Sequence, residues 1–587
     1  MGTVSAPMRG VNPPLPSIAR LKPDAKVWWG KVMNVWVRVK PLLLKHRKEC
    51  LVALAFVAVL AGPFILRPAD STAPSRYDRR LVIMTPHPES IRREFGPAFA
   101  KHWKRTTGET IFIDWRVAGT TELGMLIKSD FTAAFQQHWQ KELQKPWSNE
   151  VAASFFNPKT NPADAARAEF LKSSVGIGVD LFFGGGPYDF AEQAGNGSIV
   201  ATDSRTGAGL TRIKTKHPAW FSDSGIQAKV SGEAFYDPEL RWTGTCMSSF
   251  GMVFNRDVLK RLGVEHEPAQ WSDLTNPKLR GQIALADPGK SGTVAKAFEM
   301  LIQQQMHTAV ARLTQNPGRL KTPEEIEAAG VREGWLKGLA LIQDISANAR
   351  YFTDQSPKIP LEVTKGDAAA GMCIDYYGRS AEEKVRQPDG TSRVGFIAPM
   401  GGTAISVDPM AMMRGAPDPE LAEAFMEFVL SDAGQKLWNF RSRVPGGPER
   451  IALRRLPIRK DIYSPANLML MVDANEKPFE MAQAFVYRPE RTAHLFAVIR
   501  FLIRVICVDT HREQRAAWST MADFEYPNRA MEVFHDLSLV NYDTATDGLK
   551  KLLSARDKVL EVREARRLTE AFRRQYDMAA RFAREGE

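Results

Sequence analysis

The sequence predicts an α/β fold, because a short apolar strand, a small polar loop and an amphipathic helix follow one another several times. Three stretches show this order most clearly: LVIMTPHPESIRREFGPAFAKHWKRTTG, ETIFIDWRVAGTTELGMLIKS and VDLFFGGGPYDFAEQAGNGSI. Such repetition predicts a parallel sheet covered by helices, with ligands outside the carboxyl ends of the strands. We therefore expect three loops to lie side by side: those around His87, around Thr120 and Thr121, and at Gly184, Gly185 and Gly186.

Length and composition predict a large globular protein with more than one core. The chain has 587 residues, of which 44% are hydrophobic and 25% are charged, which is typical of a folded protein of two or more lobes. Most of the formal charge of +12 comes from the first fifty residues, where ten Lys and Arg residues stand against Asp24 and Glu49. The main body is therefore not predicted to bind nucleic acid.

An uncharged apolar run, LVALAFVAVLAGPFIL, follows this basic tail and stops at Arg67. It predicts a transmembrane signal anchor, and the basic residues Lys45, Arg47 and Lys48 before it predict that the tail stays in the cytoplasm. A cleaved signal peptide is the alternative, although a leader of this length is unusual. We expect a basic cytoplasmic tail at 1–48, the anchor at 49–67, a linker at 68–78 and an extracytoplasmic body after them.

The four cysteines, Cys50, Cys246, Cys373 and Cys507, are too scattered for a zinc site or a CxxC redox pair. In an oxidising compartment, a disulfide between Cys246 and Cys373 is a hypothesis to be tested.

Two regions depart from the strand–loop–helix order. Residues 130–175 are long for a connection and indicate a helical insertion. Residues 449–587 are predominantly helical. Their most apolar piece, LFAVIRFLIRVICV, has Arg500 and Arg504 on one helical face, which predicts a packed amphipathic helix, not a second membrane span. We expect these helices to pack on the first lobe.

The stretch ALADPGKSGTVAKAF contains Gly-Lys-Ser where a strand runs into a helix, as in a nucleotide-binding P-loop. The first glycine of that motif would fall at Ala284, so the phosphate cradle is not predicted. The same letters predict a helix N-terminus whose backbone N–H groups attract an anion. Ser291, Gly292 and Thr293 then carry the hypothesis, and Lys290 is expected to be solvated.

Six stretches resemble the extracellular solute-binding proteins of ABC importers. They are TPHPESI, AGTTELGMLI, DLFFGGG, WSDLTNPKLRGQIALADPGKSG, GDAAAGMCIDYYGR and PELAEAFMEFVLSDAGQKLW. The resemblance covers about residues 80–445 and is strongest to the group that binds ferric iron, hexose phosphates, phosphonates or thiamine. It implies a two-lobed type 2 periplasmic-binding fold that closes on its ligand by a hinge.

On this basis we expect the following domains. Lobe 1 comprises 79–245, with the insertion at about 130–175, and a return at 403–448. Lobe 2 comprises 246–402. A helical C-terminal extension at 449–587 lies outside the family pattern.

Two ligand classes follow from the resemblance and the residues. The family's ferric-iron ligands map onto His87, Tyr376 and Tyr377, whereas the family's glutamate position falls in the loop of Gly184, Gly185 and Gly186. The loss of that carboxylate favours an organic anion. An anion would be held by backbone N–H groups of the glycine loop and of Ser291, Gly292 and Thr293, by the hydroxyls of Thr120 and Thr121, and by Arg379.

Each of these residues also has a purely structural interpretation. His87 can be an ordinary loop residue, the glycines can serve a tight turn, Ser291 can be a helix cap and Arg379 can be an ion-pair partner. Adjacent Tyr376 and Tyr377 would point to opposite faces if the chain there were extended, so we expect one of them to line the cleft.

The function predicted from the sequence is binding, not catalysis. The chain has no HExxH, and Ser249 lacks the first glycine of GxSxG because Met247 stands there. We expect a membrane-tethered protein that delivers a small anion or chelated metal to an ABC permease and its ATPase, with no cofactor of its own. The alternatives are a ferric-iron-specific binding protein and a membrane-anchored sensor or scaffold.

Overall fold

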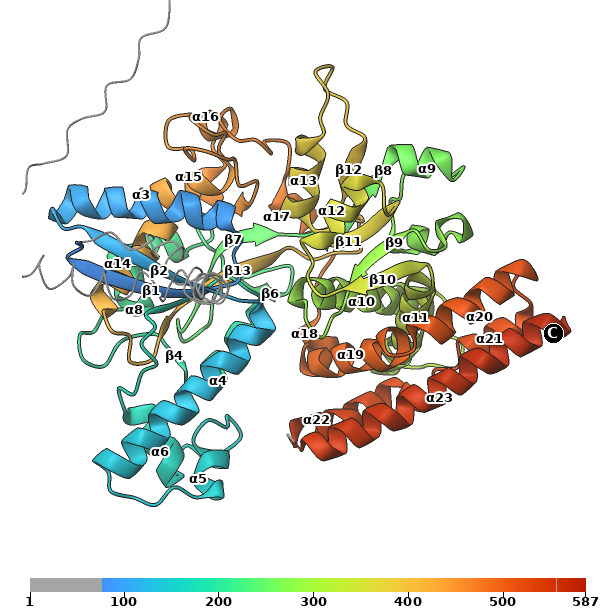
Figure 1. Cartoon of the computed structure of the whole chain (residues 1–587), viewed down its shortest axis with the longest axis horizontal. Coiled ribbons are helices and arrows are strands. Elements are labelled where there is room, and N and C mark those ends of the chain that lie inside the picture. Colours follow the sequence, from blue (N-terminus) through green and yellow to red (C-terminus); the bar gives the residue numbers. More distant parts are fainter. Residues whose placement is uncertain (1–75, 556, 587) are drawn as a thin grey trace, which may run out of the picture. The chain divides into compact units, whose positions relative to one another are not determined.

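The computed structural model describes residues 76–555 and 557–586, so the predicted tail and anchor at 1–67 lie outside the described residues (Figure 1). Tyr77–Glu587 forms one compact unit. Within the described residues, no helix combines the length and apolar character needed to cross a membrane. The apolar stretch at 495–508 is instead a packed helix in two parts, as its two arginines predicted.

The fold is mixed α/β and contains two larger sheets. The first sheet has seven strands in the order β14-β7-β13-β3-β1-β2, with β4 also pairing with β13. Its strands are β1 (Arg79–Thr85), β2 (Ile111–Val117), β3 (Leu181–Phe183), β4 (Ile199–Val200), β7 (Thr243–Ser248), β13 (Ser406–Met413) and β14 (Leu456–Pro457). Parallel pairing of β2, β1 and β3 brings their carboxyl ends to one edge, as the sequence predicted.

The second sheet has five strands in the order β10-β9-β11-β8-β12. They are β8 (Phe250–Asn255), β9 (Ile283–Ala286), β10 (Ala349–Thr353), β11 (Ala370–Ile374) and β12 (Val394–Ile397). A separate hairpin joins β5 (Lys229–Val230) to β6 (Glu233–Ala234).

The parallel arrangement predicted from the strand–loop–helix units holds for β2, β1 and β3, but both larger sheets are mixed. β8 pairs antiparallel with β11 and β12, and β13 pairs antiparallel with β3 and β7. The reason is that the chain passes directly between the sheets, from β7 through Ser249 to β8, and returns from β12 to β13. Such passages do not follow the strand–helix–strand rule that makes neighbouring strands parallel.

Helices cover both sheets (Figure 1). In the part that contains the first sheet they are α3 (Glu89–Thr107), α4 (Thr120–Gln137), α5 (Asn149–Ser154), α6 (Ala165–Lys172), α7 (Pro187–Asn196), α8 (Leu210–Lys216), α14 (Pro419–Leu430) and α15 (Asp432–Asn439). In the part that contains the second sheet they are α9 (Arg256–Arg261), α10 (Gly292–Gln315), α11 (Pro323–Ala347), α12 (Lys358–Lys365) and α13 (Asp375–Lys384).

The C-terminal region is helical. Its α-helices are α16 (Pro465–Leu468), α17 (Pro478–Met481), α18 (Pro489–Thr492), α19 (Phe496–Ile503), α20 (His511–Asp523), α21 (Asn528–Phe534), α22 (Lys550–Ser554) and α23 (Lys558–Glu585). α19 packs on α10 and α20 packs on α11, so this layer covers the helices of the second sheet (Figure 1).

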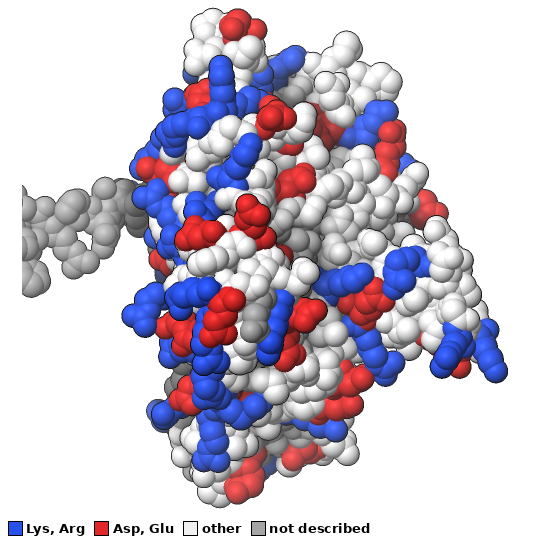
Figure 2. Space-filling model, turned by 90° about the vertical axis from the view of Figure 1, so that its right-hand side faces the viewer, with Lys and Arg blue, Asp and Glu red and all other residues white. Residues whose placement is uncertain are grey.

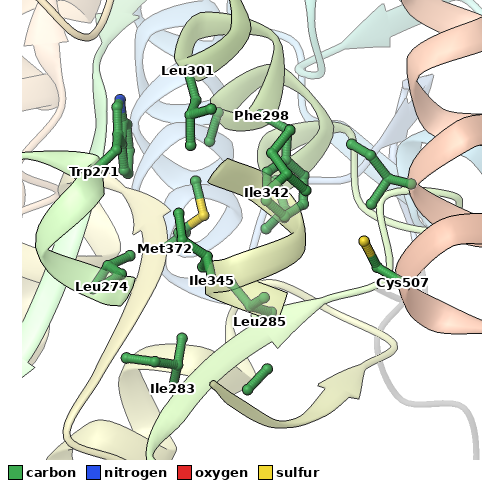
Figure 3. Close-up of a cluster of buried hydrophobic side chains, with 14 of the residues drawn as sticks. Trp271, Leu274, Ile283, Leu285, Phe298, Leu301, Ile342, Ile345, Met372 and Cys507 are labelled. Atoms are coloured by element: carbon green, nitrogen blue, oxygen red, sulfur yellow. The ribbon is translucent and has the colours of Figure 1, made fainter. Parts of the chain in front are cut away.

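Two hydrophobic cores follow the two sheets. The first core is built by side chains from Leu81 to Met247 and from Ile405 to Ala482, and the second by side chains from Phe250 to Ala404 and from Phe485 to Ala583. Figure 3 shows Cys507 of the C-terminal region at the second core, together with Leu285 and Phe298. The expectation that the C-terminal helices pack on the first lobe is therefore wrong from Phe485 onward. Their amphipathic pattern indicated a buried face but not the partner of that face.

The surface carries charges of both signs. On the face shown in Figure 2, basic and acidic side chains are interspersed. A face of mixed charge differs from the one-sided basic patch that is typical of nucleic-acid-binding surfaces.

Candidate functional site

A cavity of about 1010 Å³ is lined by segments from both cores and by part of the C-terminal region. Nine of the twelve predicted ligand-binding residues line it: His87, Thr120, Gly185, Gly186, Ser291, Gly292, Thr293, Tyr376 and Tyr377. The other three, Thr121, Gly184 and Arg379, do not line it. The cavity thus brings together residues that are almost 300 positions apart in the chain, and the binding role of each remains a prediction.

Four helices begin at this cavity. The lining includes the N-cap or first-turn residues of α4, α7, α10 and α13, namely Gly119 and Thr120, Gly186 and Pro187, Ser291 and Gly292, and Ile374 and Tyr376. The N–H groups of a first helical turn have no partner within the helix, and the helix dipole adds positive potential there. Four such ends at one cavity attract negative charge.

The Gly-Lys-Ser segment forms a turn and a helix cap and lacks a phosphate cradle. The N–H groups of Lys290 and Ser291 donate to the carbonyl of Asp287, at 3.0 and 2.9 Å. Ser291 Oγ accepts from Val294 N at 3.3 Å and so caps α10. Lys290 is exposed, as expected.

His87 is buried beneath the glycine loop. Its Nε2 lies 3.2 Å from Asp408 Oδ2, and its side chain is only 2% exposed. Desolvation lowers the pKa of His87 despite the neighbouring carboxylate. A Cβ at position 184 would lie 2.5 Å from His87 Nε2, and Gly184 has φ of +91°. Glycine at position 184 is thus required by the close approach of this imidazole.

Arg455 is the site residue that sequence reasoning missed. Its Nη2 lies 2.7 Å from Asp408 Oδ2 and donates to Ser248 Oγ at 2.9 Å, and its guanidinium lies 4.3 Å from the centre of the Tyr376 ring. Burial alone would raise the pKa of Asp408, but Arg455 and His87 outweigh burial and lower it. Arg455 follows the region of resemblance. It directly precedes β14, which pairs with β7, and its backbone N–H donates to the carbonyl of Trp438 at 2.9 Å.

Tyr376 and Tyr377 both line the cavity, which makes the expectation of opposite faces wrong. They lie in the first turn of α13, not in extended chain, and their ring centres are 4.2 Å apart. Desolvation raises the pKa of both phenols, most strongly that of Tyr376. Ligation of a metal by phenolate would have to overcome this preference for the neutral form.

Two of the predicted polar residues are used in contacts away from the cavity. Arg379 Nη2 lies 3.2 Å from Glu476 and 3.6 Å from Asp375, and its side chain is buried, so its structural interpretation is supported. Thr121 Oγ1 accepts a hydrogen bond from Arg500 Nη2 at 2.9 Å.

A second polar cluster, which we call the lysine cluster, was also missed and consists of Lys296, Glu233, Glu299 and Tyr487. Lys296 Nζ lies 2.7 Å from Glu233 and 2.9 Å from Glu299, and Tyr487 Oη donates to Glu299 at 2.8 Å. All four residues line the cavity. They come from the hairpin β5–β6, from α10 and from the C-terminal region, so no local spacing indicates the cluster.

In total six carboxylates and four cationic side chains line the cavity: Glu122, Asp189, Glu192, Glu233, Glu299 and Asp408, with Lys229, Lys290, Lys296 and Arg455. Asp408 is paired with Arg455, and Lys296 lies between Glu233 and Glu299. Burial raises the pKa of Asp189 to about 6. The cavity is therefore polar and of mixed charge, not uniformly cationic.

The part of the chain that the structure describes contains no group of three or more His, Cys, Asp or Glu side chains that could hold a metal ion. Cys246, Cys373 and Cys507 are buried free thiols. The hypothesis of a disulfide between Cys246 and Cys373 is therefore wrong for this structure. The two residues lie on strands of different sheets, β7 and β11.

Residues 223–460 match the family model described as bacterial extracellular solute-binding protein. The chain is a relative of the bacterial extracellular solute-binding proteins. Arg455, Asp408, Ser291 and the two tyrosines lie within the matched residues, whereas His87 lies before them. The resemblance found from the six sequence stretches is confirmed at the level of the family.

Curated relatives align with only part of this chain. An uncharacterised protein of Haemophilus influenzae is 24% identical over 191 residues, which are 32% of this chain and 45% of that protein. The phosphoglycerate transport regulatory protein PgtC of Salmonella typhimurium is 24% identical over 191 residues, 32% of this chain and 39% of that protein. The alignments thus span less than half the length of either relative.

Among solved structures, the periplasmic binding protein AfuA of Actinobacillus pleuropneumoniae, with exogenous fructose-6-phosphate bound, aligns at 18% identity. The alignment covers 61% of this chain and 81% of AfuA, with a TM-score of 0.40.

Proposed function

We propose that the protein captures a small organic anion in the cavity between its two sheets and delivers it to an ABC permease. The match of residues 223–460 to the family model of extracellular solute-binding proteins supports a role in binding over catalysis, and it supports an extracytoplasmic body. The predicted anchor at 49–67 would tether that body to the cytoplasmic membrane. The cavity volume is in the range of sites for small organic ligands.

The observation that carries the proposal is the meeting of four helix N-termini with Arg455 at one cavity. α4 and α7 follow strands of the first sheet, whereas α10 and α13 follow strands of the second. A ligand that accepts hydrogen bonds from the N-termini of both helix pairs, α4 and α7 on one side and α10 and α13 on the other, would be bound most tightly when the two lobes are closed. Binding is then coupled to hinge closure.

The carboxylates of the cavity narrow the class of ligand. A bare inorganic anion would be repelled by the carboxylates of Asp189 and Glu192 and by the two glutamates of the lysine cluster. An anion with hydroxyl groups can instead donate hydrogen bonds to these carboxylate oxygens. We therefore favour a hydroxylated carboxylate or phosphate ester over sulfate. The name of the relative PgtC, a phosphoglycerate transport regulatory protein, agrees with this class.

The proposal is tested by calorimetric titration of the full chain in detergent micelles. The panel is 3-phosphoglycerate, fructose 6-phosphate, citrate, ferric citrate, sulfate and putrescine. We expect saturable binding of at least one hydroxylated anion, weaker binding of sulfate and none of putrescine. Lys290→Ala, at an exposed rim position, is the matched control for Arg455→Lys and should weaken binding less. Binding of putrescine alone would contradict the proposal.

Ferric iron is the second candidate, because His87, Tyr376, Tyr377 and Asp408 line the same cavity. The pairing of His87 Nε2 with Asp408 and the neutral phenols disfavour it. If Fe(III) gave a visible charge-transfer band that disappeared in Tyr377→Phe, the iron proposal would replace the anion proposal. A sensor or scaffold role would be favoured if the solute is bound but a permease fails to co-purify with the full chain.

A further inference from the structure

The C-terminal region crosses between the two cores. Side chains from Leu453 to Ile458, and Ala482, belong to the first core, whereas Phe485 and Tyr487 belong to the second. Its start is fixed to the first part of the chain by Glu94, whose carboxylate accepts the N–H groups of residues 449, 450 and 451 at 2.7, 2.9 and 2.9 Å. This crossing is a third connection, besides β7–β8 and β12–β13.

Just after the crossing, Tyr487 is held from both sides. Its N–H donates to the carbonyl of Ser231 at 2.8 Å, next to the hairpin β5–β6, and its hydroxyl donates to Glu299 of α10 at 2.8 Å. Gly232 has φ of +84°, and a Cβ there would lie 1.8 Å from the carbonyl oxygen of Tyr487. Only glycine allows the hairpin to approach this segment so closely.

The next turns of the chain reach the helix N-termini at the cavity. The Phe496 ring lies 4.6 Å from the Tyr188 ring of α7. Arg500 donates to Thr121 Oγ1 of α4 at 2.9 Å and, from the same nitrogen, to the carbonyl of Gly289 at 2.7 Å. Arg500 therefore joins α4 to the loop before α10 through one side chain.

Segment 487–500 is also part of the cavity wall. Tyr487, Pro489, Ala493 and Phe496 line the cavity together with residues of both sheets. Leu495, Val498 and Ile499 of the same segment are buried in the second core. The segment thus belongs to one lobe by its packing and contacts the other lobe at the point where the solute is predicted to bind.

We propose that segment 487–500 is a strap that holds the two lobes together across the cavity and must release α4 and α7 before solute can enter. The link to solute entry rests on the proposed function, whereas the effect of segment 487–500 on the exchange rates of α4 and α7 can be measured without any solute. Two fixed crossovers alone permit a hinge to open freely. The contacts of Phe496 with Tyr188 and of Arg500 with Thr121 add interactions that separation of the lobes would have to break.

The test is hydrogen–deuterium exchange, read by mass spectrometry, of the full chain in detergent micelles without solute. The variant Phe496→Ala/Arg500→Ala removes both contacts with the first lobe. The matched control is Arg504→Ala on the same helical stretch, because Arg504 lies outside segment 487–500 and pairs with Asp509 at 3.4 Å. Phe496→Leu/Arg500→Gln is the milder pair if the double alanine variant does not fold.

We expect the amides that donate to carbonyls of the first turn, from Leu123 in α4 and from Phe190 in α7, to exchange at least tenfold faster in the double variant. Amides of β9 and α14 should keep their wild-type rates, which excludes general unfolding, and the control should match wild type. Unchanged exchange rates at α4 and α7, or an equal increase of these rates in Arg504→Ala, would overturn the proposal of a strap. If the strap is confirmed and no solute of the panel binds, the proposed function fails while the conformational inference stands.

Discussion

Arg455 and Asp408 form a buried ion pair, with Nη2 and Oδ2 2.7 Å apart, that joins the C-terminal region to β13 at the cavity. Removal of one member of such a pair leaves an uncompensated charge in the interior. We expect Arg455→Met to lower the free energy of unfolding by about 3–5 kcal/mol. Denaturant unfolding followed by circular dichroism measures this change.

The double variant Arg455→Met/Asp408→Asn is the control, because it removes both charges. It should recover a large part of the lost stability. If the double variant is as unstable as the sum of the two single variants, the pair is not the source of the effect.

A substitution at Gly184 tests whether this position requires glycine because of the close approach of His87. Alanine at this position adds a Cβ 2.5 Å from His87 Nε2 and requires an L-residue at φ of +91°. We expect a loss of about 2–4 kcal/mol in the free energy of unfolding. Gly292→Ala is the matched control, since no atom lies within 4 Å of its added Cβ, and it should change stability by less than about 0.5 kcal/mol. Equal stabilities of the two variants would contradict the steric argument.

Asp189 predicts a pH dependence of stability. Its pKa is about 6 in the folded state against an ordinary value of 3.8, because burial disfavours the carboxylate. The folded state therefore keeps a proton that the unfolded state has lost. This contribution is complete below pH 3.8 and is lost as the pH rises through 6. Relative to Asp189→Asn, wild type should lose about 1–2 kcal/mol between pH 4 and 7. Parallel stability curves of the two proteins would contradict the assignment.

The buried thiols predict slow alkylation. Burial raises the pKa of Cys246 and Cys507 to about 12 and that of Cys373 even further. Peptide mapping after iodoacetamide treatment at pH 8 should find these three cysteines unmodified in the native protein and fully modified after denaturation without reductant. A Cys246–Cys373 peptide pair in the denatured sample would contradict the free thiols of the structure.

The sequence predicted the local parts of the fold well, because these parts are set by short-range patterns. β1, β2 and β3 were each expected to end in a loop before a helix, and their parallel pairing brings His87, Thr120 and Gly185 to one cavity. The cap at Ser291 follows from the same short-range chemistry.

The features that could not be predicted from the sequence depend on contacts between residues far apart in the chain. Arg455 directly precedes the two-residue strand β14, which pairs with β7, and the lysine cluster joins residues from Glu233 to Tyr487. The partner of the C-terminal helices is likewise decided by the second core, since an amphipathic helix shows which face is buried but not what buries it. The expectation for Tyr376 and Tyr377 rests on an extended chain, whereas α13 begins at Asp375 and places both tyrosines in its first turn.

The most direct test of the central claim is calorimetric titration of 3-phosphoglycerate, fructose 6-phosphate and citrate into wild type and into Arg455→Lys. We expect saturable binding of at least one of these anions to wild type. We also expect at least tenfold weaker binding to the lysine variant, because lysine lacks the planar fork that contacts Asp408, Ser248 and the Tyr376 ring together. Absence of binding by wild type, or equal affinity of the two proteins, would contradict an anion site at Arg455.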